Sequence, residues 1–312
     1  MKIVWITGGK GFIGRYLARG LAERGCKVFG IGHGLWPAED AAGCSYSFWC
    51  NGEIEAANLS QLATVSGSPE TIYHLAGGSS VGASFQNPQE DFSRTVESTA
   101  RLLEWMRLNA ARCKVIAVSS AAVYGAGHSG RILEDVSIAP YSPYGFHKAM
   151  MESLCRSYCG NFGLRAVLVR LFSIYGPGLK KQLLWDICGK LRSAGGHSIM
   201  LGGTGSEIRD WLHVSDAVRL LHLVGNECGV GCKILNGGTG IGTRVSEIAA
   251  FVGRAWGSHS TIEFSGVARD GDPVELVADT TRIAHLGFEP SVALQHGIHE
   301  VIEWFKRGRE EV

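Results

Sequence analysis

Short apolar runs alternate with amphipathic stretches through the first 170 residues of the chain. The runs are rich in β-branched residues, as expected for strands that are buried on both faces. They cover residues 2–6, 27–31, 71–76, 114–120 and 165–172. Between them the apolar positions follow a helical period, for example at Leu17, Leu21 and Ala22. This alternation predicts a parallel sheet with right-handed crossovers.

A glycine-rich loop joins the first predicted strand to the first helix. Gly8, Gly11 and Gly14 have the spacing of loops that hold a dinucleotide pyrophosphate. The first glycine permits a tight turn, the second lets the backbone approach the phosphates, and the third lets the helix pack on the strand. The free N–H groups at the helix start then favour an anion. The loop therefore predicts a dinucleotide-binding domain.

The pattern becomes irregular after residue 175, where glycine-rich turns appear at 195–205 and 237–242. We therefore predict an α/β fold, a Rossmann-like doubly wound parallel sheet with a smaller C-terminal substrate-binding domain. The dinucleotide-binding domain is assigned to residues 1–172 and about 211–240, and the substrate domain to about 173–210 and 241–312.

Composition excludes several other classes of protein. The chain has 30 Lys and Arg against 29 Asp and Glu, and no basic stripe alternates with aromatic residues, so we expect no nucleic-acid partner. No apolar run reaches the roughly 18 residues that a membrane helix needs, and no signal-peptide pattern is seen. The nine cysteines are scattered and lack metal or redox spacing. We expect a cytoplasmic protein with free thiols and no metal site.

Two later stretches carry hydroxyl and amine groups in a catalytic spacing. "SSAAVYG" occupies 119–125 after the fourth predicted strand, and "YGFHK" opens a helix at 144–148. Tyr144 and Lys148 therefore lie one turn apart on one helix face. A phenol with a pKa of about 10 is a poor base at neutral pH. A neighbouring ammonium is expected to lower that pKa, and a serine hydroxyl can bridge the phenol and a substrate oxygen.

This constellation resembles the extended short-chain dehydrogenases/reductases, and more narrowly their NAD-dependent epimerase/dehydratase branch, which acts on nucleotide sugars. The similarity covers nearly the whole chain and includes "HLAG" (74–77), "RLFSIYGPG" (170–178) and "GGTGSEIRDWLHVSD" (202–216). It implies an enzyme in which Ser120 is the catalytic serine, Tyr144 the acid/base and Lys148 its partner. Ser119 stays open as the alternative hydroxyl.

The resemblance also implies how the cofactor is bound. NAD-binding members carry an aspartate at the end of the second strand, where this chain has Gly32 followed by His33. Without that carboxylate, and with Lys10 in the glycine loop, the site favours a ribose 2′-phosphate. We therefore expect NADP(H), with NAD possible. The expected cofactor-binding residues are Gly8, Lys10, Gly11, Phe12, Ile13, Gly14, His33, Glu53, Ile54, Leu75, Ala76, Tyr144 and Lys148.

For the substrate, the resemblance implies a nucleoside-diphosphate sugar. Two arginines stand where the family places guanidinium groups on the diphosphate, and a planar fork of donors suits phosphate oxygens. Three serines are expected to edge the sugar pocket. The family also commonly dimerises through two helices per subunit, so we expect a homodimer. The residues expected to contact the substrate are Ser79, Ser80, Ser84, Ser120, Arg209 and Arg269.

Departures from the family pattern narrow the reaction. Members that eliminate water carry an acid and a base after the catalytic hydroxyl, where this chain has Ala121 and Ala122. The residues of the C3,C5-epimerising and the decarboxylating members are not matched either. Thr95 and Ser173 stand where asparagine is common, which puts contacts through those positions in doubt. Chemistry at one carbinol, usually C4, is what remains.

Three functions satisfy these constraints. The first, which the expected NADP(H) preference favours, is a reductase of a 4-keto nucleotide sugar, for example a 4-keto-6-deoxyhexose. The second is a C4 epimerase, which oxidises the sugar and then reduces its opposite face. The third is a non-catalytic cofactor-sensing protein, against which the Ser120, Tyr144 and Lys148 set argues. A reductase of small carbonyl compounds is a lesser alternative, because Arg209 and Arg269 indicate an anionic ligand.

Overall fold

The structure is a computed structural model that describes residues 1–312 except 37–40, 42, 228, 258–259, 269–270 and 309–312. The chain divides into two compact units. The first consists of Met1–Tyr124, Val136–Leu171 and Val218–Asn236, and the second of Gly125–Asp135, Phe172–Ala217 and Gly237–Val312. Relative to the predicted domains, the main difference is that residues 125–135 belong to the second unit.

A seven-stranded sheet forms the first unit, with the order β11-β7-β5-β4-β1-β2-β3. The pairings from β3 through β7 are parallel. This is the predicted Rossmann-like arrangement, which is thereby confirmed. The strands are β1 (Ile3–Thr7), β2 (Lys27–Gly32), β3 (Phe48–Asn51), β4 (Thr71–His74), β5 (Lys114–Ser120), β7 (Arg165–Leu171) and β11 (Cys232–Gly237).

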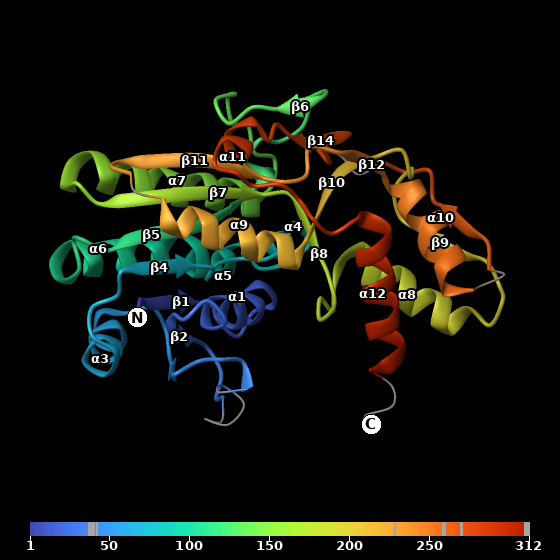
Figure 1. The fold of residues 1–312 in the computed structure, drawn as a ribbon. Coiled ribbons are helices and arrows are strands. Elements are labelled where there is room, and N and C mark those ends of the chain that lie inside the picture. Colours follow the sequence, from blue (N-terminus) through green and yellow to red (C-terminus); the bar gives the residue numbers. More distant parts are fainter. Residues whose placement is uncertain (37–40, 42, 228, 258–259, 269–270, 309–312) are drawn as a thin grey trace. The chain divides into compact units, whose positions relative to one another are not determined.

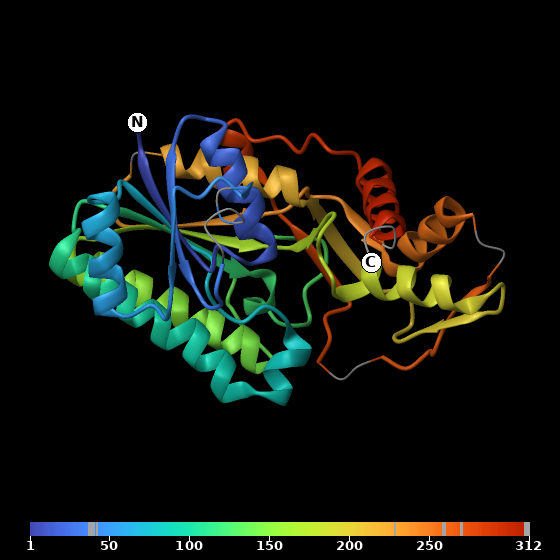
Figure 2. The same cartoon turned by 90° about the horizontal axis from the view of Figure 1, so that it is seen from below.

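Helices cover both faces of this sheet (Figures 1 and 2). Helices α3, α6 and α7 cover one face, while α1 and the part of α9 from Val218 onward lie on the other. An apolar core of the first unit lies under α3, α6 and α7 and includes Trp5, Leu103 and Met151. Full burial of such a side chain contributes roughly 1.5–3 kcal/mol. The helices are α1 (Phe12–Ala22), α3 (Ala56–Ser66), α6 (Ser98–Asn109), α7 (Pro143–Phe162) and α9 (Val214–Asn226).

The carboxyl ends of the strands meet at one edge of this sheet. Thr7 pairs with both Ile31 and His74, and Ser120 pairs with Leu171. Ligands of open α/β sheets bind at this edge because the loops after the strands gather there. The glycine loop follows β1 and the predicted catalytic serine ends β5, so the register brings both to the same edge.

The second unit contains a five-stranded sheet of order β12-β10-β14-β6, in which β8 also pairs with β10, and a two-stranded sheet of β13 and β9. Ile187, Ile248 and Phe305 belong to its own apolar core. Its strands are β6 (Arg131–Ile132), β8 (Ser173–Tyr175), β9 (Ile199–Leu201), β10 (Ile208–His213), β12 (Gly242–Arg244), β13 (Ile262–Phe264) and β14 (Glu275–Ala278). Its helices are α8 (Gln182–Ala194), α10 (Val245–Trp256), α11 (Thr281–His285) and α12 (Leu294–Arg307).

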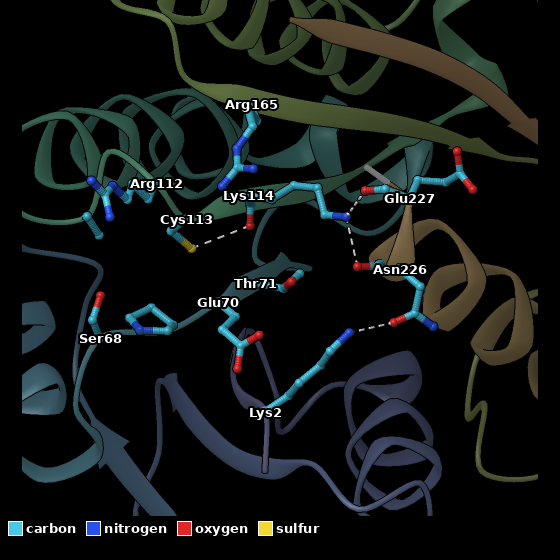
Figure 3. A pocket seen from close by; sticks show the side chains of 13 residues that line it. Lys2, Ser68, Glu70, Thr71, Arg112, Cys113, Lys114, Arg165, Asn226 and Glu227 are labelled. Atoms are coloured by element: carbon cyan, nitrogen blue, oxygen red, sulfur yellow. Dashed lines mark hydrogen bonds between the residues drawn. The ribbon is translucent and has the colours of Figure 1, made fainter. Parts of the chain in front are cut away.

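A cavity of about 390 Å³ opens at the opposite, amino end of the seven-stranded sheet (Figure 3). Lys114 at the start of β5 is buried there, and its Nζ donates to the carbonyls of Gly225 at 2.8 Å and Glu227 at 2.5 Å. Lys2 Nζ donates to Asn226 Oδ1 at 2.9 Å. These cations stabilise the carboxyl end of α9, where the helix dipole is negative. Of the helices in the described ranges, none is long and apolar enough for a membrane span.

Candidate active site

Tyr144 stands in the first turn of α7 because the local sequence starts the helix there. Ser142 is the N-cap, and its Oγ accepts a hydrogen bond from the Gly145 N–H at 3.1 Å. Pro143 occupies the first helical position, where its fixed φ suits the helix. A Cβ on Gly145 would lie 2.6 Å from the Ala122 carbonyl oxygen. Glycine therefore lets α7 pack directly against the turn that follows β5.

Ser120, Tyr144 and Lys148, the three predicted catalytic residues, come together at the carboxyl edge of the sheet. The Ser120 side chain lies beside the Tyr144 phenol, and its hydroxyl accepts from the Ala122 N–H at 3.2 Å. Lys148 Nζ lies 5.8 Å from the centre of the Tyr144 ring and donates to the Val118 carbonyl at 2.9 Å. The arrangement can exchange a proton between the phenol and a bound hydroxyl while a cation lies nearby.

Ser119 and Ser120 face different surroundings, as successive residues of a strand do. The Ser119 hydroxyl donates to Glu152 Oε1 at 2.6 Å and is buried. Glu152 is itself fully buried and accepts two hydrogen bonds from Arg170, at 2.9 and 2.7 Å. Ser119 is therefore engaged behind the site, and Ser120 is the hydroxyl beside Tyr144.

Burial dominates the proton affinities of the site. Lys148 is 3% exposed, and burial lowers its pKa to about 8, against the opposing charges of Asp91 and Glu152. The pKa of Tyr144 is raised by burial, while the hydrogen bond from Ser120 lowers it and the charge of Asp91 adds to the increase. The expected lowering of the phenol pKa by the ammonium is therefore not found in this structure, because burial raises the pKa and Lys148 is not among the groups that shift it.

The loop after β1 fits the pyrophosphate of a dinucleotide. Gly8 has a φ of +66°, and a Cβ there would lie 2.8 Å from the Ala76 amide nitrogen. Helix α1 begins at Phe12, and its N-cap, Gly11, has no side chain to bind the first N–H groups. These groups can donate to an anion at the positive end of the helix dipole. The predicted residues Ile13 and Gly14 belong to this first turn, and Leu75 directly follows β4.

Lys10 lies over the loop that follows β2. Its Nζ donates to the Leu35 carbonyl at 2.8 Å and lies 5.8 Å from the ring centre of Trp36. That loop begins after Gly32 with His33, which is exposed. The ammonium is thus close to the end of β2, where nucleotide-binding sheets contact the adenosine ribose.

Glu53 and Ile54, two further residues expected to bind the cofactor, follow β3. Glu53 Oε2 lies 3.2 Å from the Arg101 guanidinium in a partly exposed ion pair. Ile54 is 6% exposed and belongs to the apolar core of the first unit. Their roles in cofactor binding stay predictions.

The predicted substrate-binding serines differ in their surroundings. Ser80 caps α4 (Val81–Gln86), accepting from the Ala83 N–H at 3.3 Å. Ser84 is fully buried, donates to the Val81 carbonyl at 2.7 Å and accepts from the Tyr144 N–H at 3.0 Å. Ser84 therefore helps to fix the start of α7. A contact of Ser79, Ser80 or Ser84 with a sugar stays a prediction.

The two predicted diphosphate-binding arginines belong to the second half of the chain. Arg209 lies on β10 in the second unit, donates to the Ile208 carbonyl at 2.9 Å and lies 3.4 Å from Asp272 Oδ1. Its side chain is 15% exposed, which leaves only part of the guanidinium accessible. Arg269 lies outside the described residues. Binding of a substrate by either arginine stays a prediction.

Four ionisable residues around this site were not singled out from the sequence: Asp91, His147, Glu152 and Arg170. One of them carried a usable signal, because Glu152 follows Lys148 by four residues and so lies on the same helix face. Asp91, His147 and Arg170 gave no such signal, because their interaction partners are distant in the sequence or lie on another element. Among the described residues, no group of three or more His, Cys, Asp or Glu is arranged to hold a metal ion.

This fold and site define an enzyme of the extended short-chain dehydrogenase/reductase type, as predicted. The model of the "NAD dependent epimerase/dehydratase family" matches residues 4–236, and the chain belongs to that family. It is 30% identical over 311 residues to a UDP-glucose 4-epimerase of Mycolicibacterium smegmatis, covering 96% of this chain and 97% of the relative.

Solved structures agree with this assignment. MoeE5 in complex with UDP-glucuronic acid and NAD superimposes with a TM-score of 0.86 at 29% identity, over 98% of this chain and 99% of that one. The UDP-glucuronic acid 4-epimerase of Bacillus cereus, in complex with UDP-glucuronic acid and NAD, gives a TM-score of 0.87 at 25% identity with the same coverage. The similarity therefore extends over both units of the chain.

Proposed function

We propose that this protein is a C4 epimerase of UDP-sugars. The observation that carries the proposal is that Ser120 and Tyr144 lie together beside the buried Lys148, followed by Ala121 and Ala122, which have no group to move a second proton. Such a site acts on one carbinol. The relatives named above as 4-epimerases match over nearly their full length. They favour the epimerase, held second in the sequence analysis, over the 4-keto sugar reductase.

The proposed mechanism uses the three catalytic residues at one sugar oxygen. Bound NAD(P) would supply a hydride acceptor and donor at C4. Tyr144 takes the proton of the C4 hydroxyl during oxidation and returns it to the same oxygen during reduction of the opposite face. Ser120 binds that oxygen and the phenol together, and the Lys148 ammonium stabilises the phenolate. The alanines at 121 and 122 leave the C5 proton and the C6 hydroxyl untouched.

Incubation of the enzyme with UDP-glucose, UDP-galactose, UDP-glucuronic acid and UDP-galacturonic acid tests this function. We expect interconversion of one C4-epimeric pair without added reductant, measured by proton NMR of the anomeric signals. Consumption of NADPH with a 4-keto sugar, and no epimerisation, would favour the reductase instead. A product lighter by one water in the mass spectrum would contradict the interpretation of Ala121 and Ala122. Cofactor binding without turnover of any sugar would favour the sensing protein.

We further propose that the cofactor site prefers NADP(H) to NAD(H). Support comes from Gly32 at the end of β2, which offers no carboxylate to repel a 2′-phosphate, and from the Lys10 ammonium beside Leu35. The solved relatives named above hold NAD, so the proposed preference would distinguish this chain from them. A cytoplasmic location and a homodimer also stay proposals. Phe146 and Met150 give α7 an exposed apolar stripe that suits a helix-to-helix interface.

Lys10→Ala is expected to weaken NADPH binding by roughly tenfold, the scale of one lost hydrogen bond to a charged group. NADH binding should change little, because NADH lacks the 2′-phosphate. Fluorescence titration of both cofactors against wild type and variant measures the difference. Lys27→Ala, an exposed lysine at the other end of β2, is the matched control. Equal wild-type affinities, or an unchanged NADPH affinity in Lys10→Ala, would refute the preference.

A further inference from the structure

A buried histidine–aspartate pair lies beside Tyr144 and Lys148. His147 Nδ1 is 2.6 Å from Asp91 Oδ2, and the two side chains are only 12% and 6% exposed. His147 precedes Lys148 in α7, and Asp91 lies in the short helix α5 (Pro88–Phe92). The ring of Phe92 packs edge-on against His147 with centroids 5.4 Å apart. Carboxylates are rarely buried this deeply unless they are paired, and His147 is the partner of Asp91.

The helix around Asp91 has an unusual geometry. α5 continues into a π-helical turn at Ser93–Glu97 before α6 begins. Such turns are rare and frequently mark functional sites. Thr95, inside this turn, accepts a hydrogen bond from the Gly78 N–H at 2.8 Å. Asp91 contacts the same glycine, because a Cβ on Gly78 would lie 1.7 Å from Asp91 Oδ1.

The segment that Asp91 contacts also touches the catalytic lysine. A Cβ on Gly77 would lie 3.1 Å from Lys148 Nζ. The carboxylate and the ammonium therefore approach adjacent residues, Gly77 and Gly78, from two different helices. This backbone follows β4 at the carboxyl edge of the sheet, where the cofactor is expected.

Asp91 differs from the other acid near Lys148. Both oxygens of Glu152 bind the Arg170 guanidinium, so a cation already balances its charge. Asp91 has the imidazole of His147 as its partner, and no arginine or lysine is hydrogen-bonded to it among the described contacts. The negative charges of Asp91 and Glu152 raise the pKa of Lys148, and Lys148 in turn lowers the pKa of the buried His74. Asp91 also raises the pKa of Tyr144.

We infer that Asp91 and His147 are positioning residues of this active site. The Asp91 carboxylate is the counter-charge that keeps the Lys148 ammonium protonated and in place, and His147 anchors that carboxylate. The inference rests on the proposed roles of Tyr144 and Lys148.

A consequence for pH follows from the charge on Asp91. Oxidation of the sugar needs the Tyr144–Lys148 pair to have lost one proton. The pKa of Lys148, about 8, is lower than the raised pKa of Tyr144. Because the two groups share their protons, we expect the pair to lose its first proton with an apparent pKa of about 8. A negative Asp91 raises both pKa values and so opposes the loss. Without that charge, the active form appears at lower pH.

Asp91→Asn tests the inference, because the amide keeps the shape and an acceptor for the imidazole but removes the charge. In wild type we expect kcat/KM to rise with pH to a plateau, with a midpoint near 8. In Asp91→Asn the midpoint should fall by about one pH unit and the plateau kcat by roughly tenfold. His147→Ala should also lower the midpoint, because a buried carboxylate without its partner favours the neutral form and so loses its charge. His147→Gln keeps a donor and should retain the wild-type midpoint.

Glu90→Gln is the matched control. Glu90 is the neighbour of Asp91 in α5, but it pairs with Arg94 at the surface, where both side chains are more than half exposed. The pH midpoint and the plateau kcat of Glu90→Gln should match those of wild type. A lower plateau in Asp91→Asn with an unmoved midpoint would indicate a merely structural role and would overturn the inference, as would an unchanged profile.

A measurement without substrate separates this inference from the proposed function. The ¹³Cε signal of Lys148 in labelled protein, assigned with Lys148→Met, reports the protonation of the amine directly. In Asp91→Asn its midpoint should fall by about one pH unit. An unmoved midpoint overturns the inference even if the enzyme epimerises a UDP-sugar. A lowered midpoint in a protein that turns over no UDP-sugar supports the charge role of Asp91 and rejects the proposed function alone.

Discussion

Tyr144→Phe is expected to lower turnover by about 100-fold or more, the usual cost of losing a general acid/base. Phenylalanine preserves the ring but lacks the hydroxyl that lies beside Ser120. The backbone contacts that start α7, between Ser84 and the Tyr144 N–H and between Ser142 and Gly145, do not involve the phenol. The variant should therefore fold and bind cofactor normally. Steady-state kinetics with the converted UDP-sugar, cofactor titration and thermal unfolding measure these three properties.

The control for this variant lies on the same helix. The Tyr158 hydroxyl donates to Glu104 Oε2 at 3.2 Å, remote from Ser120, so Tyr158→Phe should retain turnover close to that of wild type. Lys148→Met should also be strongly impaired, because the phenolate then forms without a neighbouring cation. Near-normal turnover in Tyr144→Phe between about pH 6 and 9 would contradict its assignment as the acid/base.

The fold could be predicted because its main strands are buried on both faces and therefore appear as continuous apolar runs. The runs at 2–6, 27–31 and 114–120 became β1, β2 and β5. β3 was not predicted, because its four residues, Phe48–Asn51, are too short for a periodic signal. Such a strand is specified by pairing with β2, which is a tertiary contact that a local pattern does not encode.

The site could be predicted where its residues lie close together in the sequence or in a recurring motif. The spacing of Tyr144 and Lys148 indicated a shared helix face, and the glycine loop indicated a phosphate site. The partner of a polar side chain is harder to predict when it comes from another element. Ser84 illustrates this, because its hydroxyl holds the Tyr144 N–H from 60 positions away. Asp91 and His147 are 56 positions apart, and neither residue type signals the other.

The pKa of Tyr144 is another property that could not be predicted from the sequence, because it depends on how deeply the side chain is buried. The sequence supplied the neighbouring cation, which lowers the pKa of a phenol, but not the burial that raises it. Burial depends on how α7 packs against the turn after β5, where Gly145 meets Ala122. The choice between reductase and epimerase is harder still, because both reactions use the same three catalytic residues. The residues of the site limit the reaction to one carbinol, and the relatives named as 4-epimerases favour the epimerase over the reductase.

A buried ion pair ties together three elements behind the catalytic residues. Arg170 on β7 donates to both oxygens of Glu152 on α7, and Glu152 also accepts from Ser119 on β5. The two charged side chains are only 2% and 0% exposed. The guanidinium also stacks 4.8 Å from the ring centre of Tyr124, and the Tyr124 hydroxyl donates to Asn236 Oδ1 at 2.6 Å. Every strong donor and acceptor around the pair is thus engaged within the first unit.

Arg170→Met is therefore expected to lower the free energy of unfolding by about 3–5 kcal/mol, because it leaves the Glu152 charge buried without a cation. Urea unfolding followed by circular dichroism measures the change. In the double variant Arg170→Met/Glu152→Leu most of the loss should be recovered, since two apolar side chains replace the pair and no buried charge remains. Arg101→Met is the control: its ion pairs with Glu53 and Glu97 are partly exposed, so its effect should stay within about 1 kcal/mol. If the double variant were as unstable as Arg170→Met alone, packing around Arg170, rather than the unpaired carboxylate, would be the source of the loss.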